Sequence, residues 1–255
     1  MATQLLDGTA AVRPSSAPAR KPRRVWSGNP AVVLWGTVVG KKVVMAVTGI
    51  VLVGFVIAHM LGNLKIFLGT EAIDEYAVFL RTVGEPAIPA GVLLWVVRTV
   101  LLVCVALHIT AAVQLTRMNW AARPRGYDTK KSIATTYAAR TMRWGGVIVV
   151  LFIIYHLLHL TAGVVGFRPG EFVDLSVYHN VVAAFSVWYI ALFYVVAMAS
   201  LCLHLDHGVW SMLQTLGWNN AWTTRSLQIL SRGLSLVVFV GFISVPVAVL
   251  AGWVR

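Results

Sequence analysis

The sequence is poor in charge, and in acidic residues above all. Of its 255 residues 12% are charged, about half the fraction of a soluble domain, and nine acidic residues face 21 Lys and Arg. With 58% hydrophobic residues and a mean hydropathy of +0.79, this composition argues against a large soluble core and predicts an integral membrane protein. The net charge of +12 then indicates basic cytoplasmic loops and no nucleic-acid partner.

Cysteine is just as scarce, and several metal motifs are missing. The two cysteines, Cys104 and Cys202, lie in apolar runs without a CxxC pair, which supports neither a disulfide framework nor a zinc ribbon. An HExxH motif is absent as well, which excludes the zinc site of a membrane metalloprotease. The basic stretch ARKPRR is not followed directly by an apolar segment with a cleavage site, so we expect no cleavable signal peptide.

What the sequence does contain is long apolar segments, and five of them reach the roughly 20 residues that cross a bilayer. They lie near residues 43–68, 92–116, 144–166, 183–205 and 233–253. The predicted fold class is therefore all-α, an integral membrane bundle of five transmembrane helices within residues 31–255. Proline and serine predict a disordered basic tail over residues 1–30. We expect the segment around Trp35, which is too short to span, at the interface, and residues 70–91 flat on the membrane surface until Pro86.

Lysine and arginine are distributed unevenly among the connections, and this predicts the orientation. They gather before the first span, between the second and third, and between the fourth and fifth. The other two connections carry most of the acidic residues, namely Glu71, Asp74, Glu75, Glu85, Glu171 and Asp174. Because Lys and Arg are enriched in cytoplasmic loops, we expect a cytoplasmic N-terminus and an external C-terminus.

Four of the seven histidines fall well inside predicted spans: His59, His108, His156 and His204. An ionisable side chain at such a depth is by default a functional residue. A lone histidine has an alternative, which is a neutral ring hydrogen-bonded to a neighbouring helix. Four histidines on four different spans favour a shared function.

Counting residues from the ends of the spans places these histidines at two depths. His59 follows Lys42 by 17 residues and His156 follows Arg143 by 13, which is about 25 Å and 20 Å of helix from the cytoplasmic side. Both therefore lie in the outer half of the membrane.

The other two histidines lie in the inner half. His108 precedes Arg117 by nine residues, and His204 follows Trp188 by 16, which is about 14 Å from the inner anchor and 24 Å from the outer belt. Two imidazoles that face each other at one depth in a bundle suit the ligation of a haem iron. Two such pairs, one above the other, would carry electrons across the membrane.

Other metal centres are less well matched, and one remains open. A diiron desaturase clusters more histidines than these, at the cytoplasmic helix ends. An iron–sulfur centre with mixed ligands is the open alternative, because Cys104 precedes His108 by one turn and Cys202 is close to His204. A cysteine in an apolar helix is more often a small packing residue.

A weak internal repeat relates the first and third spans. TGIVLVGFVIAH ends at His59, and GGVIVVLFIIYH ends at His156. In both segments a glycine, Gly49 or Gly146, precedes the histidine by ten residues. The two spans are therefore expected to be related helices that run in the same direction.

Four segments carry a resemblance to a known family: AVTGIVLVGFVIAHMLGNLKIF, LLWVVRTVLLVCVALHI, YHLLHLTAGV and LHLDHGVWSMLQTLG. Over residues 40–255 the chain resembles the five-helix, dihaem cytochrome b subunit that anchors bacterial succinate dehydrogenase and fumarate reductase (complex II), in its actinobacterial form. The resemblance implies haem-iron ligation by His59 with His156 at the outer haem and by His108 with His204 at the inner haem.

The resemblance also implies a role in the respiratory chain and the tricarboxylic acid cycle. The chain would be the subunit of succinate dehydrogenase (a succinate:quinone oxidoreductase) that does not bind the dicarboxylate, in the bacterial cytoplasmic membrane. A flavoprotein subunit and an iron–sulfur subunit would dock on its cytoplasmic face, and electrons would pass through two b haems to a quinone, expected to be menaquinone. The remaining alternatives are a haem cytochrome of another respiratory dehydrogenase and a transporter or structural anchor with no redox centre.

Cationic side chains are candidates for the haem propionates, and a group at the outer end is the candidate quinone site. Arg98, in an apolar span, is expected to pair with a propionate because a buried guanidinium needs a partner. The candidate propionate partners are Arg98, Arg143, Arg140 and Lys65. The candidate quinone residues are Asn63, Lys65, Phe67, Arg98 and Glu71.

Overall fold

The computed structural model describes residues 28–122 and 137–255, with side chains described from Met142 onward in the second range. The predicted disordered tail, residues 1–30, lies almost wholly outside the described residues. Every regular element in the described ranges is a helix, which confirms the all-α prediction.

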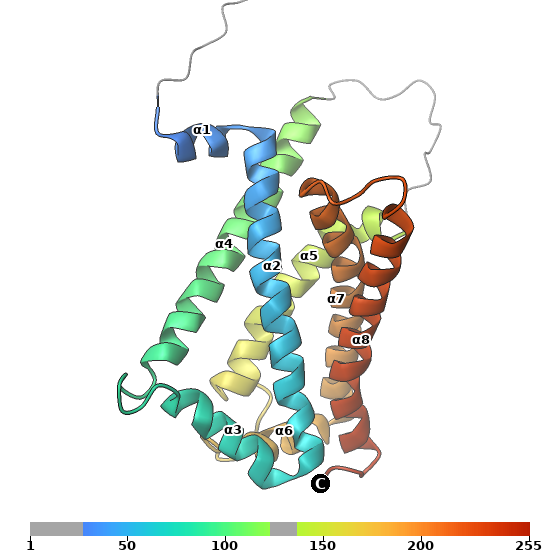
Figure 1. Cartoon of the computed structure of the whole chain (residues 1–255). Helices are drawn as coiled ribbons and strands as arrows, with labels where there is room; N and C mark the ends of the chain where they lie inside the picture. Colours follow the sequence, from blue (N-terminus) through green and yellow to red (C-terminus); the bar gives the residue numbers. More distant parts are fainter. Residues whose placement is uncertain (1–27, 123–136) are drawn as a thin grey trace, which may run out of the picture.

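Five of these helices are long and apolar enough to cross a membrane, as the sequence predicted for a multi-pass membrane protein. They stand side by side as a bundle in Figure 1. Their bounds are α2 (Val38–Asn63), α4 (Val92–Ala121), α5 (Tyr137–His156), α7 (Trp188–Thr215) and α8 (Thr224–Leu250).

The boundaries of three predicted spans differ most from the helices. The fifth helix, α8, begins at Thr224 and ends at Leu250, where the prediction was 233–253. The fourth span does not begin at residue 183, because residues up to Phe185 belong to a separate short helix, α6 (Val177–Phe185), and α7 starts at Trp188. Val181, Ala184 and Phe185 of α6 are buried in the protein core. The third span ends before residue 166: α5 passes into a π-helical segment, η2 (Leu157–Thr161), and the chain then turns at Gly163 and Gly166, both with positive φ.

Short helices close the two ends of the bundle. At one end α1 (Pro30–Gly36) lies across the start of α2; at the other α3 (Thr70–Thr82) and α6 lie beneath the long helices, close to the C-terminus (Figure 1). We refer to these as the α1 end and the α3–α6 end. The predicted surface segment 70–91 is thus helical in its first part, and the helix ends at Thr82, before Pro86.

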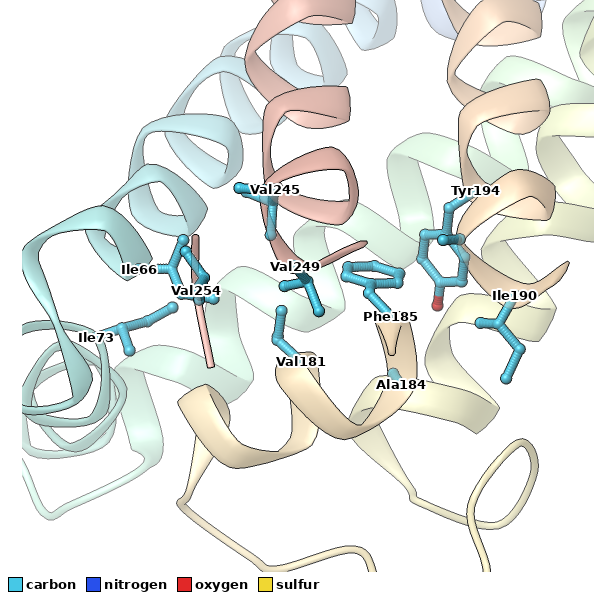
Figure 2. Packing of buried hydrophobic residues seen from close by; sticks show 12 residues of the cluster. Ile66, Ile73, Val181, Ala184, Phe185, Ile190, Tyr194, Val245, Val249 and Val254 are labelled. Atoms are coloured by element: carbon cyan, nitrogen blue, oxygen red, sulfur yellow. The ribbon is translucent and has the colours of Figure 1, made fainter. Parts of the chain in front are cut away.

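The α3–α6 end is held by a buried apolar cluster, shown in Figure 2. Ile66 comes from the 3₁₀ segment η1 (Leu64–Leu68), Phe185 from α6 and Val249 from α8, and each is at most 6% exposed. Tyr194 of α7 packs edge-on against Phe185, with ring centres 4.9 Å apart. This cluster fixes the position of α7 relative to the short helices below it.

Polar contacts tie α3 to the start of α6. The carboxylate of Asp74 accepts a hydrogen bond from the backbone N–H of Tyr178, at 2.9 Å, and so satisfies an N–H that the helix itself leaves unpaired. The Arg81–Asp174 ion pair, at 3.2 Å, is largely exposed and contributes little to stability. Asp74 is therefore the polar residue that matters for this junction.

The long helices pack unequally. The most extensive contacts are those of α7 with α8, α2 with α4, and α5 with α7, and α2 also touches α7. The span in α4 is the least buried of the five. Helices α2, α4, α5 and α7 therefore form two packed pairs, α2 with α4 and α5 with α7, which meet where α2 contacts α7.

We expect Asp74→Ala to lower the free energy of unfolding by about 1 kcal/mol, the usual cost of removing a side-chain cap from a helix N-terminus. The measurement is thermal unfolding of the purified protein in detergent. The control is Glu75→Ala, which removes an exposed carboxylate from the same helix. An equal loss in both variants would contradict the role given to Asp74.

Candidate functional site: two imidazole pairs inside the bundle

The structure brings the four span histidines together in two pairs. The imidazoles of His59 on α2 and His156 on α5 have ring centres 5.8 Å apart and planes at 81°. Those of His108 on α4 and His204 on α7 have ring centres 6.4 Å apart and planes at 57°. Each pair joins one helix of the α2–α4 pair to one helix of the α5–α7 pair.

The separation of the rings fits a metal atom bonded to both. With metal–nitrogen bonds of roughly 2 Å and each ring centre about 1.1 Å beyond its nitrogen, the two ring centres lie about 6 Å apart. The observed 5.8 and 6.4 Å agree with this value. Any angle between the planes is compatible, because each ring can turn about its metal–nitrogen bond.

The hydrogen-bond contacts of the Nδ1 atoms are also compatible with metal ligation through the other ring nitrogen. Nδ1 of His156 lies 3.4 Å from the hydroxyl of Tyr194, and Nδ1 of His108 lies 3.2 Å from the hydroxyl of Thr48. Metal-bound histidines typically use their second nitrogen in this way, which fixes the tautomer and leaves the other nitrogen for the metal. Nδ1 of His204 is buried and has no hydrogen-bond partner among the described residues.

The glycines of the sequence repeat lie against the second pair. A Cβ atom on Gly49 of α2 would lie 3.8 Å from Cε1 of His108, and one on Gly146 of α5 would lie 3.6 Å from Cε1 of His204. Each glycine precedes the histidine of its own helix by ten residues, which is about 15 Å of helix. The repeat therefore defines two levels along the bundle. One level contains His59 and His156, and the other contains Gly49 and Gly146 beside His108 and His204.

Aromatic rings enclose the His59–His156 pair. Phe55 stacks on His59 with ring centres 5.3 Å apart, Phe242 lies 5.9 Å from His59, and Phe152 lies 5.6 Å from His156. They exclude water from the imidazoles and lower the local dielectric, which strengthens any polar interaction made there. None of the three phenylalanines stood out in the sequence, since aromatic residues are common in apolar helices.

The predicted propionate partners lie apart from one another. Arg98 is exposed on α4, with its guanidinium over the ring of Trp95 at 5.0 Å, so the protein does not enclose it as expected. Arg143 is also exposed, over Trp120 at 5.7 Å. The side chain of Arg140 lies outside the described residues.

The candidate quinone residues lie toward the α3–α6 end, nearest to the His59–His156 pair along the chain. Asn63 ends α2, Lys65 and Phe67 are in η1, and Glu71 is in the first turn of α3. The ammonium of Lys65 lies over the ring of Tyr76, 5.3 Å from its centre. Of this set, Glu71 borders the shallow hollow found beside α3 in the described part of the chain, and the other four residues do not line that hollow.

The cysteines stay apart from any ligand cluster. Cys104 and Cys202 are free and half-buried. In residues 28–122 and 142–255, no three His, Cys, Asp or Glu side chains come together in a group that could hold a metal ion. The donors at this site are therefore pairs of imidazoles, which do not form the four-ligand set of an iron–sulfur cluster.

The sequence did not reveal the involvement of Tyr194 and Thr48, or the role of His159. His159 is 0% exposed, and its Nδ1 lies 2.9 Å from the Tyr194 hydroxyl. The available signal was weak: a phenol or hydroxyl inside an apolar span needs a hydrogen-bond partner, but the partner lies on another helix.

No family model, no curated protein and no solved structure matches the chain.

Proposed function

We propose that this chain is the dihaem cytochrome b membrane anchor of a bacterial succinate dehydrogenase. It would hold two b haems and pass electrons from an iron–sulfur subunit to a membrane quinone, expected to be menaquinone. The observation that carries the proposal is the pair of facing imidazoles at each of two levels, with separations that fit a shared metal atom. The sequence resemblance to dihaem anchors supports the same assignment independently of these distances.

His59 with His156 would hold one haem, and His108 with His204 the other. Haem held by these residues would supply one-electron chemistry, and because two histidines would ligate its iron, it would transfer electrons without binding oxygen. The chain's own residues keep the rings oriented: Tyr194 bonds Nδ1 of His156, and the aromatic side chains around the first pair exclude water.

The distribution of charge supports an orientation in the bacterial cytoplasmic membrane. Lys41, Lys42 and Arg117 lie toward the α1 end, and Glu71 and Asp174 belong to the α3–α6 end. We infer that the α1 end and the N-terminus are cytoplasmic. The flavoprotein and iron–sulfur subunits would then dock at the α1 end, and electrons would pass from the His108–His204 level to the His59–His156 level.

The quinone would react at the outer, α3–α6 end, close to the His59–His156 level. Asn63 and Lys65 offer donors to a quinone oxygen or a propionate, Phe67 offers an apolar ring, and Glu71 a carboxylate that relays protons. Arg98 remains a candidate for a propionate, because an exposed guanidinium in an apolar helix gains most from an anionic partner.

The test of this function is the haem content of the purified complex. A dithionite-reduced minus oxidised spectrum, together with a pyridine haemochrome assay, should give two b haems per chain. Absence of haem would overturn the proposal in favour of a haem-free anchor or the mixed His/Cys iron–sulfur centre, which an iron and sulfide assay identifies. Co-purification of a succinate-oxidising flavoprotein separates this function from that of a formate dehydrogenase or hydrogenase cytochrome.

Single histidine variants should remove one haem each. We expect His59→Ala to reduce the haem:protein ratio from two to one and to leave the His108–His204 haem intact. His108→Ala is the matched variant on the other pair and should remove the other haem, with a different loss in the reduced spectrum. Equal loss of both haems from His59→Ala, in protein that remains folded by circular dichroism, would contradict the pairing.

A bulky side chain at the repeat glycine should act on the second pair alone. Gly49→Leu would place three carbons beyond a Cβ that already lies 3.8 Å from the His108 ring, so we expect loss of the His108–His204 haem only. Gly233→Leu on α8 is the control, because a Cβ there meets nothing within 4 Å. Two haems per chain in Gly49→Leu would show that this glycine does not border the site.

A further inference from the structure

A line of three hydrogen-bonded side chains runs away from the first imidazole pair. Nδ1 of His156 lies 3.4 Å from the hydroxyl of Tyr194, and that hydroxyl lies 2.9 Å from Nδ1 of His159. The residues come from α5, α7 and the π-helical segment η2, respectively. One phenol thus joins a candidate haem ligand to a second histidine one turn further along the chain.

The far end of this line is sealed inside the protein. His159 is 0% and Tyr194 6% exposed, and Nε2 of His159 has no hydrogen-bond partner among the described residues. A Cβ on Gly166 would lie 2.7 Å from that nitrogen, and the ring of Phe167 lies 4.8 Å from the imidazole. Gly166 thus packs against the Nε2 side of the ring, and the hydrogen bond that the His159 ring makes among the described residues is the one with Tyr194.

Ligation of a metal by His156 would fix the direction of these hydrogen bonds. A neutral imidazole has one N–H and one bare nitrogen. If Nε2 of His156 binds the metal, its Nδ1 carries the hydrogen and donates to the Tyr194 oxygen. The Tyr194 hydroxyl then donates to Nδ1 of His159, which makes the phenol oxygen more electron-rich and a stronger acceptor.

The second imidazole pair lacks such an arrangement. Nδ1 of His108 lies 3.2 Å from the hydroxyl of Thr48, and that hydroxyl donates to the backbone carbonyls of Val44 and Met45 at 2.8 and 3.2 Å. Nδ1 of His204 has no partner among the described residues. A buried phenol backed by an imidazole is therefore particular to the first pair.

We propose that Tyr194, backed by His159, is a positioning residue that lowers the reduction potential of the haem held by His59 and His156. An acceptor on the Nδ1 hydrogen raises the basicity of a metal-bound imidazole, and the more electron-rich ligand favours ferric over ferrous iron. Hydrogen bonding around the ligands is one of the means by which a protein sets haem potentials. This inference rests on the proposed function.

The test is a redox titration of the holoprotein at fixed pH, followed optically, with Tyr194→Phe. Removing the hydroxyl leaves Nδ1–H of His156 without its acceptor, so the potential of the His59–His156 haem should rise. We expect the reduced:oxidised ratio of that haem at a given ambient potential to increase about tenfold, which is about 59 mV for one electron. The potential of the His108–His204 haem should not move.

Tyr155→Phe is the matched control, because it removes another phenol hydroxyl from the same aromatic cluster. The Tyr155 ring lies 5.3 Å from that of His159 and 6.2 Å from that of Tyr194, yet its hydroxyl makes no hydrogen bond to His156, His159 or Tyr194. Both potentials should equal those of the unaltered protein. An equal shift in Tyr155→Phe and Tyr194→Phe would overturn the inference, since packing alone would then explain it.

His159→Phe provides a second, independent variant. It fills the same space but removes the acceptor of the Tyr194 hydroxyl, so the potential of the same haem should rise, by less than in Tyr194→Phe. If Tyr194→Phe fails to retain that haem, His159→Phe decides the question. Two bound haems whose potentials neither variant moves would overturn this inference alone, whereas a chain without haem would overturn the proposed function itself.

Discussion

The need of buried imidazoles for partners on their ring nitrogens is the constraint around which the interior of this bundle is arranged, and among the described residues Nδ1 of His204 and Nε2 of His159 are the two such nitrogens left without one. Inside an apolar span no water is available to bond an N–H or a bare nitrogen, and each unpaired group costs several kcal/mol. His156 and His108 satisfy one nitrogen each, through Tyr194 and Thr48, and turn the rest of the ring toward another histidine. In the proposed function, a metal atom shared by the two rings would satisfy what remains, and it would add a second link between the α2–α4 and α5–α7 pairs beside the contact of α2 with α7.

The glycine–histidine repeat explains how one bundle builds two such levels. Helices α2 and α5 run in the same direction, and each supplies a histidine at one level and, ten residues earlier, a glycine at the other. Helices α4 and α7 supply His108 and His204 where those glycines leave room. The distance between the levels is therefore set by the helical rise within α2 and α5, and neither level can slide without moving both helices.

The sequence predicted the parts of this arrangement that depend on position along a single helix. Apolar length predicted five spans. Counting residues predicted a common depth for His59 with His156 and for His108 with His204, and in the structure the rings of each of these pairs are neighbours. The misplaced start of the fourth span has a physical cause: the apolar residues of α6 cover the end of the bundle, and hydropathy does not distinguish protein core from lipid. The contacts of Tyr194 join different helices, and no local sequence pattern predicts them.

The two imidazole pairs have the same side chains and differ in their surroundings. At the α3–α6 end, the apolar cluster that contains Phe185 holds Tyr194 in place, and the turn at Gly166 closes over His159. The fold of the short helices is thus coupled to the electronic environment of His156. At the other level, Thr48 is held by its own helix alone. The surroundings of the two pairs therefore have different origins. The hydrogen-bonding partner of His156, Tyr194, is held by packing between several helices, whereas the partner of His108, Thr48, is held by hydrogen bonds within its own helix.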